Sequence, residues 1–126
     1  MKEWLRLWGP SLLLMTLIFV LSSSSTLPNV PSPLLNRILK KSAHAIGYAL
    51  LAASYARGLQ GSGREPVILL AFLCTLLYAM SDEWHQTLVP GRTGTPLDVL
   101  IDISGTVMGL SLWQRLQYRN QLNPTP

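Results

Sequence analysis

The sequence predicts an all-α polytopic membrane protein, a small bundle of about four transmembrane helices joined by short loops. Hydrophobic residues make up 48% of the chain and charged residues only 13%, whereas a soluble domain usually carries about 25% charged residues. The apolar residues fall into four segments, each close to the roughly 20 residues of a helix that crosses a bilayer. Since the chain has 126 residues, we expect residues 1–126 to form a single domain.

Each apolar segment is expected to form one helix, at about residues 4–25, 38–59, 66–86 and 96–116. The first contains SLLLMTLIFVL and is followed by serines and a proline-rich link. The second contains HAIGYALLAASYA and ends at the turn-forming stretch QGSGREP. The third contains VILLAFLCTLLYAM, and the preceding Pro66 suits a first helical turn. The fourth contains DVLIDISGTVMGLSLW.

Two alternatives to four membrane-spanning helices remain open. The first segment could be a cleaved signal peptide, because Lys2 and Arg6 precede it and small serines follow it. Trp4 and Trp8 are more typical of interfacial anchors, which favours a retained helix. The second and fourth segments are amphipathic at one end, so they could instead lie at the membrane interface.

Charge and cysteine content limit the partners. A net charge of +4 is too small and too scattered to indicate nucleic-acid binding, and anionic lipid head groups explain basic chain ends. The single Cys74 cannot form an internal disulfide. The basic residues favour cytoplasmic N- and C-termini in a bacterial cytoplasmic membrane, with Lys2, Arg6, Arg57, Arg64, Arg115 and Arg119 inside and Arg37, Lys40, Lys41 and Arg92 outside.

Polar residues form one stripe on each of the last three predicted helices, because spacings of three, four and seven residues share a helix face. The stripes comprise Lys41, His44 and Tyr48; Thr75, Tyr78, Asp82 and Gln86; and Asp98, Asp102, Gly105 and Gly109. Glu83 lies beside Asp82, and His85 and Arg92 follow. In an alternating topology the polar ends of these helices lie on one membrane side, so we expect them to converge at one outer mouth of the bundle.

This convergence could be structural or functional. A charged residue at the centre of a membrane helix costs about 2.5–3.5 kcal/mol. In a structural interpretation, Lys41 and Arg92 would neutralise the carboxylates and hold three helices together. Hydrogen bonds inside membranes contribute only about 0.6 kcal/mol on average, so apolar packing would hold the helices at lower cost. The cluster therefore favours a functional site.

The polar motifs resemble those of the VanZ-like family. They are Lys41-x-x-His44-x-x-x-Tyr48, Asp82-Glu83-x-x-Gln86, Pro90-Gly91-Arg92, and the series Asp98, Asp102, Gly105 and Gly109. The resemblance covers about residues 37–112 and keeps the motifs in order. Asp102 stands where many members carry asparagine, which puts in doubt any role that needs a neutral amide there.

The resemblance implies a small integral membrane protein, in a family named for glycopeptide (teicoplanin) resistance. It further implies an enzyme of the cell envelope that acts on lipid head groups or on lipid-linked cell-wall intermediates. The polar positions carried over from the family are Lys41, His44, Asp82, Glu83, Gln86, Arg92, Asp98 and Asp102.

These residue types suit cleavage or transfer at a phosphate ester of a lipid. His44 can act as general base or acid near neutral pH, and a desolvated Glu83, next to Asp82, could serve as the complementary acid. Asp98 or Asp102 could orient His44. We therefore predict His44, Glu83 and Asp82 as catalytic residues. The predicted substrate-binding residues are Lys41, Gln86, Arg92, Asp98, Asp102 and Tyr48, with Arg92 suited to bidentate phosphate binding.

The sequence requires no cofactor, and its spacings match no dedicated metal motif. A divalent metal stays open, because imidazole and carboxylate ligands suited to Zn²⁺ or Mn²⁺ are present: His44, His85, Asp82, Glu83, Asp98 and Asp102. The carboxylates alone would suit Mg²⁺. The alternative functions are a non-catalytic envelope protein that binds a lipid or the glycopeptide, and a small transporter. The oligomeric state is not predicted.

Overall fold

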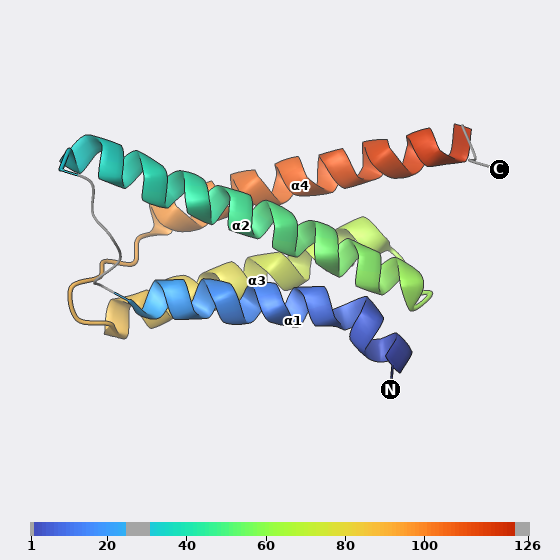
Figure 1. Ribbon diagram of the computed structural model, residues 1–126, viewed down its shortest axis with the longest axis horizontal. Coiled ribbons are helices and arrows are strands. Elements are labelled where there is room, and N and C mark those ends of the chain that lie inside the picture. Colours follow the sequence, from blue (N-terminus) through green and yellow to red (C-terminus); the bar gives the residue numbers. More distant parts are fainter. Residues whose placement is uncertain (1, 25–30, 123–126) are drawn as a thin grey trace.

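The computed structural model describes residues 2–24 and 31–122, which form four helices and no strand. These are α1 (Lys2–Ser23), α2 (Pro33–Gly61), α3 (Val67–Leu88) and α4 (Pro96–Leu122). Successive helices run in opposite directions (Figure 1), so the end of α1, the start of α2, the end of α3 and the start of α4 lie together at one end of the bundle. The predicted all-helical bundle is confirmed.

Three of the helices, α1, α3 and α4, are long and apolar enough to cross a membrane. With 29 residues α2 is long enough as well, at about 44 Å, but it is more polar. It contacts all three other helices, so a large part of its surface faces protein instead of lipid. Its buried residues include Ala52, Ser54, Ala56 and Gly58.

The outward faces carry many large apolar side chains. Leu13, Leu77 and Met108 are 70%, 67% and 71% exposed. An apolar surface of this extent is unfavourable in water and typical of contact with a membrane or another partner. Together with the three apolar helices, it identifies an integral membrane protein.

The helix bounds differ from the predicted ones at several ends. The second helix begins at Pro33 instead of residue 38, because Ser32 accepts a hydrogen bond from the Leu35 N–H (3.4 Å) and Pro33 occupies the first helical turn. The fourth continues to Leu122, past residue 116. The first ends at Ser23, and its predicted last residue, 25, lies outside the described residues.

The closest helix contact joins α2 and α4 through two glycines. A Cβ atom on Gly105 would collide with the backbone of Ala45, and one on Gly109 would collide with the backbone of Ala49. Small residues at such positions let helix backbones approach each other. The polar stripes of the two helices, which include these glycines, are thereby brought face to face.

Candidate functional site

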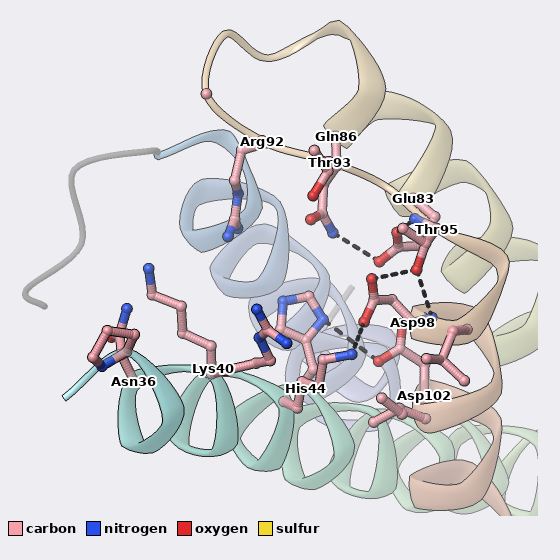
Figure 2. Close-up of a pocket in the computed structure, with 16 residues that line it drawn as sticks. Asn36, Lys40, His44, Glu83, Gln86, Arg92, Thr93, Thr95, Asp98 and Asp102 are labelled. Atoms are coloured by element: carbon pink, nitrogen blue, oxygen red, sulfur yellow. Dashed lines mark hydrogen bonds and ion pairs between the residues drawn. The ribbon is translucent and has the colours of Figure 1, made fainter. Parts of the chain in front are cut away.

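A polar cavity of about 540 Å³ lies where α2 and α4 begin and α3 ends. Its charged and hydrogen-bonding lining residues include Arg37, Lys40, Lys41, His44, Glu83, Gln86, Arg92, Asp98 and Asp102. In Figure 2 the carboxylates of Glu83, Asp98 and Asp102 gather on one side, Lys40 and Arg92 lie on the other, and His44 stands between them. The cavity thus has an acidic and a basic side.

His44 meets Asp102 across the contact between α2 and α4. The His44 Nδ1 atom lies 3.4 Å from Asp102 Oδ1. The imidazole is 22% exposed and the carboxylate 1% exposed. Among the described residues, neither Asp102 oxygen has a hydrogen-bond partner. The sequence offered Asp98 and Asp102 as candidates to orient His44, and the structure places Asp102 beside the imidazole.

Glu83 is buried on α3 and is held by hydrogen bonds from its own helix and from the loop that leads into α4. Its Oε1 accepts a hydrogen bond from Gln86 Nε2 (3.0 Å), and its Oε2 accepts one from the backbone N–H of Thr95 (3.0 Å). Gly94 packs so closely on the Glu83 carbonyl that a Cβ atom would collide with it. These contacts fix Glu83 at the junction of α3 and α4, on the acidic side of the cavity.

Asp82 and Tyr48 lie behind the cavity and are not among its lining residues. The Asp82 Oδ2 atom accepts hydrogen bonds from Ser22 Oγ (2.8 Å), the Tyr48 hydroxyl (3.3 Å) and Gln86 Nε2 (3.2 Å). Tyr48 is fully buried and Asp82 is 3% exposed. Both positions favour a supporting role over direct contact with a substrate.

Lys41 and Asp98 form an ion pair at the start of α4, with Lys41 Nζ 2.8 Å from Asp98 Oδ1. Thr95 Oγ1 donates a hydrogen bond to Asp98 Oδ2 (2.6 Å), and the Asp98 N–H donates one to Thr95 Oγ1 (3.3 Å). These reciprocal hydrogen bonds between Thr95 and Asp98 cap the helix, and Pro96 occupies its first position, so α4 begins at Pro96. The ion pair is part of the cavity wall.

Arg92 joins the α3–α4 loop to the end of α1. Gly91 turns the chain with φ of 80°, a conformation that favours glycine. Arg92 then donates hydrogen bonds through Nε to the Ser22 carbonyl (3.1 Å) and through Nη2 to the Leu21 carbonyl (3.0 Å). Carbonyls in the last turn of a helix lack partners within that helix. These contacts differ from the neutralisation of carboxylates that a structural interpretation of Arg92 required.

His85 lies apart from the cavity. Its Nε2 atom is 3.0 Å from Ser23 Oγ, and its ring stacks on Phe19 with 4.6 Å between centroids. The two histidines of the chain therefore occupy different surroundings, and only His44 is near the carboxylates of the cavity.

Sequence reasoning missed two residues that support the site. Thr95 binds both Glu83 and Asp98, and the pattern Thr-Pro-x-Asp is a recognisable helix-start signal. Ser22 donates to Asp82, but the serines after the first apolar segment were interpreted only as a break or a cleavage site. These serines lie at the same end of the bundle as the polar helix ends, and this position is the feature of the sequence that indicates a contact with the site.

Three lining residues could together hold a metal ion. One ligand atom from each of His44, Glu83 and Asp102 lies within 4.8 Å of the others. Of the remaining predicted ligands, Asp98 is paired with Lys41, and His85 stacks on Phe19.

Comparison with known protein families gives a match over most of the chain. The sequence model of the VanZ/LLP1 family matches residues 4–117, which includes parts of all four helices and the whole lining of the cavity. No curated protein and no solved structure matches the chain. Because the family match extends over most of the sequence and over every motif of the site, the chain belongs to the VanZ/LLP1 family.

Proposed function

We propose that this membrane protein is an enzyme that cleaves or transfers a phosphate-linked head group. The substrate would be an outer-leaflet lipid or a lipid-linked wall intermediate of the bacterial cytoplasmic membrane, with both termini of the protein in the cytoplasm. The observation that carries the proposal is the division of one cavity into a basic and an acidic side, with His44 between them.

The basic side suits a phosphate group. Lys40 and Arg92 form this side (Figure 2), and Arg37 also lines the cavity. Lys41, a further lining residue, is paired with Asp98. A guanidinium has five N–H donors, and Arg92 spends two on the carbonyls at the end of α1. The remaining donors can bind phosphate oxygens while the first two keep the side chain in place.

The acidic side supplies groups for proton transfer. His44 would accept the proton of the attacking hydroxyl, from water or a sugar, as that oxygen bonds to phosphorus. Glu83 in its protonated form would give a proton to the oxygen that leaves as the phosphate ester bond breaks. Asp102 would keep the imidazole in position. Each proton taken up is thus matched by one released.

The rim of the cavity suits a lipid tail. Leu97 lines the cavity and is 59% exposed, and Leu34 and Leu100 nearby on α2 and α4 are 69% and 58% exposed. A head group in the cavity would leave its acyl or polyprenyl chain against these side chains, where apolar contact is favourable.

Comparison of lipids by mass spectrometry tests the proposal. Membranes from cells with the wild-type protein, with His44→Ala, and with His85→Ala would be analysed for phospholipids and lipid-linked precursors. We expect one phosphate-linked species to accumulate with His44→Ala alone, because His85 lies outside the cavity. The absence of any changed species across growth conditions would contradict an enzymatic role.

The cationic side also favours a second candidate, a non-catalytic protein that binds an anionic lipid or the glycopeptide. Such a protein needs the cations and not the proton-transfer groups. If teicoplanin susceptibility changes with Arg92→Ala but stays at the wild-type level with His44→Ala and with Glu83→Gln, binding explains the function and catalysis does not.

A further inference from the structure

We propose that His44, Glu83 and Asp102 together bind one divalent metal ion of the zinc or manganese class. The three residues come from α2, α3 and α4, and one ligand atom of each lies within 4.8 Å of the others. All three line the cavity. The proposal rests on geometry and does not require the enzymatic function, but it assigns His44 and Glu83 to metal binding in place of the proton-transfer roles proposed above.

Asp102 provides the strongest indication of a ligand. It is 0% exposed and lies in the helix bundle. Its Oδ1 atom faces His44 Nδ1 at 3.4 Å, and its Oδ2 atom has no hydrogen-bond partner among the described residues. Buried polar atoms in native proteins nearly always have a partner, and a buried carboxylate normally has a counter-charge or a metal. A cation in the cavity would satisfy both oxygens.

The separation of His44 from Asp102 fits a shared ion. Nδ1 and Oδ1 are 3.4 Å apart, and the Oδ1 atom is without a hydrogen bond. Two ligands about 2.1 Å from a tetrahedral zinc ion are themselves about 3.4 Å apart. In any geometry, two ligands at that distance from one ion are at most about 4.2 Å apart. Small side-chain shifts would therefore bring the Glu83 oxygen into the same coordination shell.

The neighbouring carboxylates are less suited to bind this ion. Asp98 is paired with Lys41. Asp82 accepts hydrogen bonds from Ser22 and Tyr48 through Oδ2; its Oδ1 atom has no hydrogen-bond partner among the described residues, but Asp82 does not line the cavity. This leaves one imidazole nitrogen and two carboxylate oxygens, a donor set that suits zinc or manganese better than calcium or magnesium.

Three protein ligands leave coordination positions open to the cavity, as in catalytic zinc sites. An ion there would act as a Lewis acid beside the basic side that we propose for phosphate. His44 and Glu83 would then act as ligands in place of their proton-transfer roles.

Direct metal binding tests the proposal. The full chain, purified in detergent and treated with a chelator, would be titrated with Zn²⁺ or Mn²⁺. Bound metal would be measured by mass spectrometry, and bound Mn²⁺ by the loss of its free electron-spin resonance signal. We expect one ion per chain, with affinity at least about ten-fold weaker for His44→Ala and Asp102→Asn. The matched control is His85→Ala, which should bind within about two-fold of the wild type because His85 lies outside the cavity.

Two results would overturn the proposal. The first is a folded wild-type protein that retains no ion after titration. The second is equal binding by His44→Ala and His85→Ala, which would mean an adventitious ion only. Circular dichroism checks the helical content of each variant, and Asp102→Asn keeps the shape of the side chain if His44→Ala fails to fold. Since these measurements need no turnover, failure of this proposal and failure of the enzymatic one are distinguishable.

Discussion

Replacing Gly105 with alanine is expected to push α4 away from α2 and to separate the two halves of the candidate site. The added Cβ atom would lie 2.7 Å from the Ala45 carbonyl carbon and 2.8 Å from its Cα. Carbon atoms normally approach to about 3.5–4.0 Å, so α4 would have to retreat by about 1 Å. Asp102 lies one turn earlier on the same face, and its 3.4 Å separation from His44 would grow to about 4.4 Å, beyond the range of an ion pair.

Overpacking of this kind costs about 1–3 kcal/mol. The exchange of glycine for alanine inside a helix stabilises the fold by about 1 kcal/mol. Set against a clash of about 2 kcal/mol, this leaves a free energy of unfolding lower than that of the wild type by roughly 1 kcal/mol. Gly47→Ala is the matched control, because Gly47 is also inside a helix and its Cβ would meet Ile18 at an ordinary 3.6 Å. That variant receives the helical gain without the clash. The two variants should therefore differ by roughly 2 kcal/mol.

Reversible unfolding in mixed detergent micelles, followed by circular dichroism, measures this difference. The same samples can be titrated with Mn²⁺, where Gly105→Ala should bind more weakly than Gly47→Ala. Equal stabilities for the two variants, within about 0.5 kcal/mol, would refute the inference that the α2–α4 contact fixes the geometry of the site.

Two further predictions concern α1 and the orientation of the chain. Ser22→Ala removes the 2.8 Å hydrogen bond to buried Asp82 and should lower the free energy of unfolding by about 1–3 kcal/mol, while Ser23→Ala, at an exposed position, should change it by less than about 0.5 kcal/mol; similar losses in detergent unfolding would contradict this. In a chain without its native cysteine, Thr93→Cys should react with a membrane-impermeant maleimide from outside intact cells and Ser62→Cys only after lysis, because the two loops lie at opposite ends of the bundle; the reverse pattern would overturn the predicted orientation.

The helical fold was predictable because apolar segments of membrane-spanning length allow few other structures. The meeting of polar residues followed from two simple rules, helical periodicity and the alternation of helix direction. Lys41 and His44 share one stripe, as do Asp98 and Asp102, and the structure brings both stripes to the same cavity.

The pairing within the site was not predictable in the same way. Which carboxylate faces His44 depends on the rotation of α4 against α2, and this is set by the contact of Gly105 and Gly109 with the α2 backbone. The partners of Arg92 depend on the path of the loop after Gly91. The spacing of residues along the sequence determines neither the rotation of a helix against its neighbours nor the path of a loop. For this reason the sequence places Asp82 at the cavity, whereas in the structure it lies behind the lining residues.

The hydrogen bonds from Arg92 to the end of α1 have a consequence for biogenesis. Arg92 follows Leu21 by 71 residues and Ser22 by 70. The hydrogen bonds at the end of α1 can therefore form only after α3 and the loop that follows it have been synthesised. The ion pair of Lys41 with Asp98 likewise can form only after the start of α4 has been synthesised. These contacts can therefore form only after most of the chain has been synthesised, so the cavity that they border is completed late in assembly. An N-terminal truncation that removes α1 would leave Asp82 and Arg92 without these partners, even though α2, α3 and α4 supply every ligand of the proposed metal.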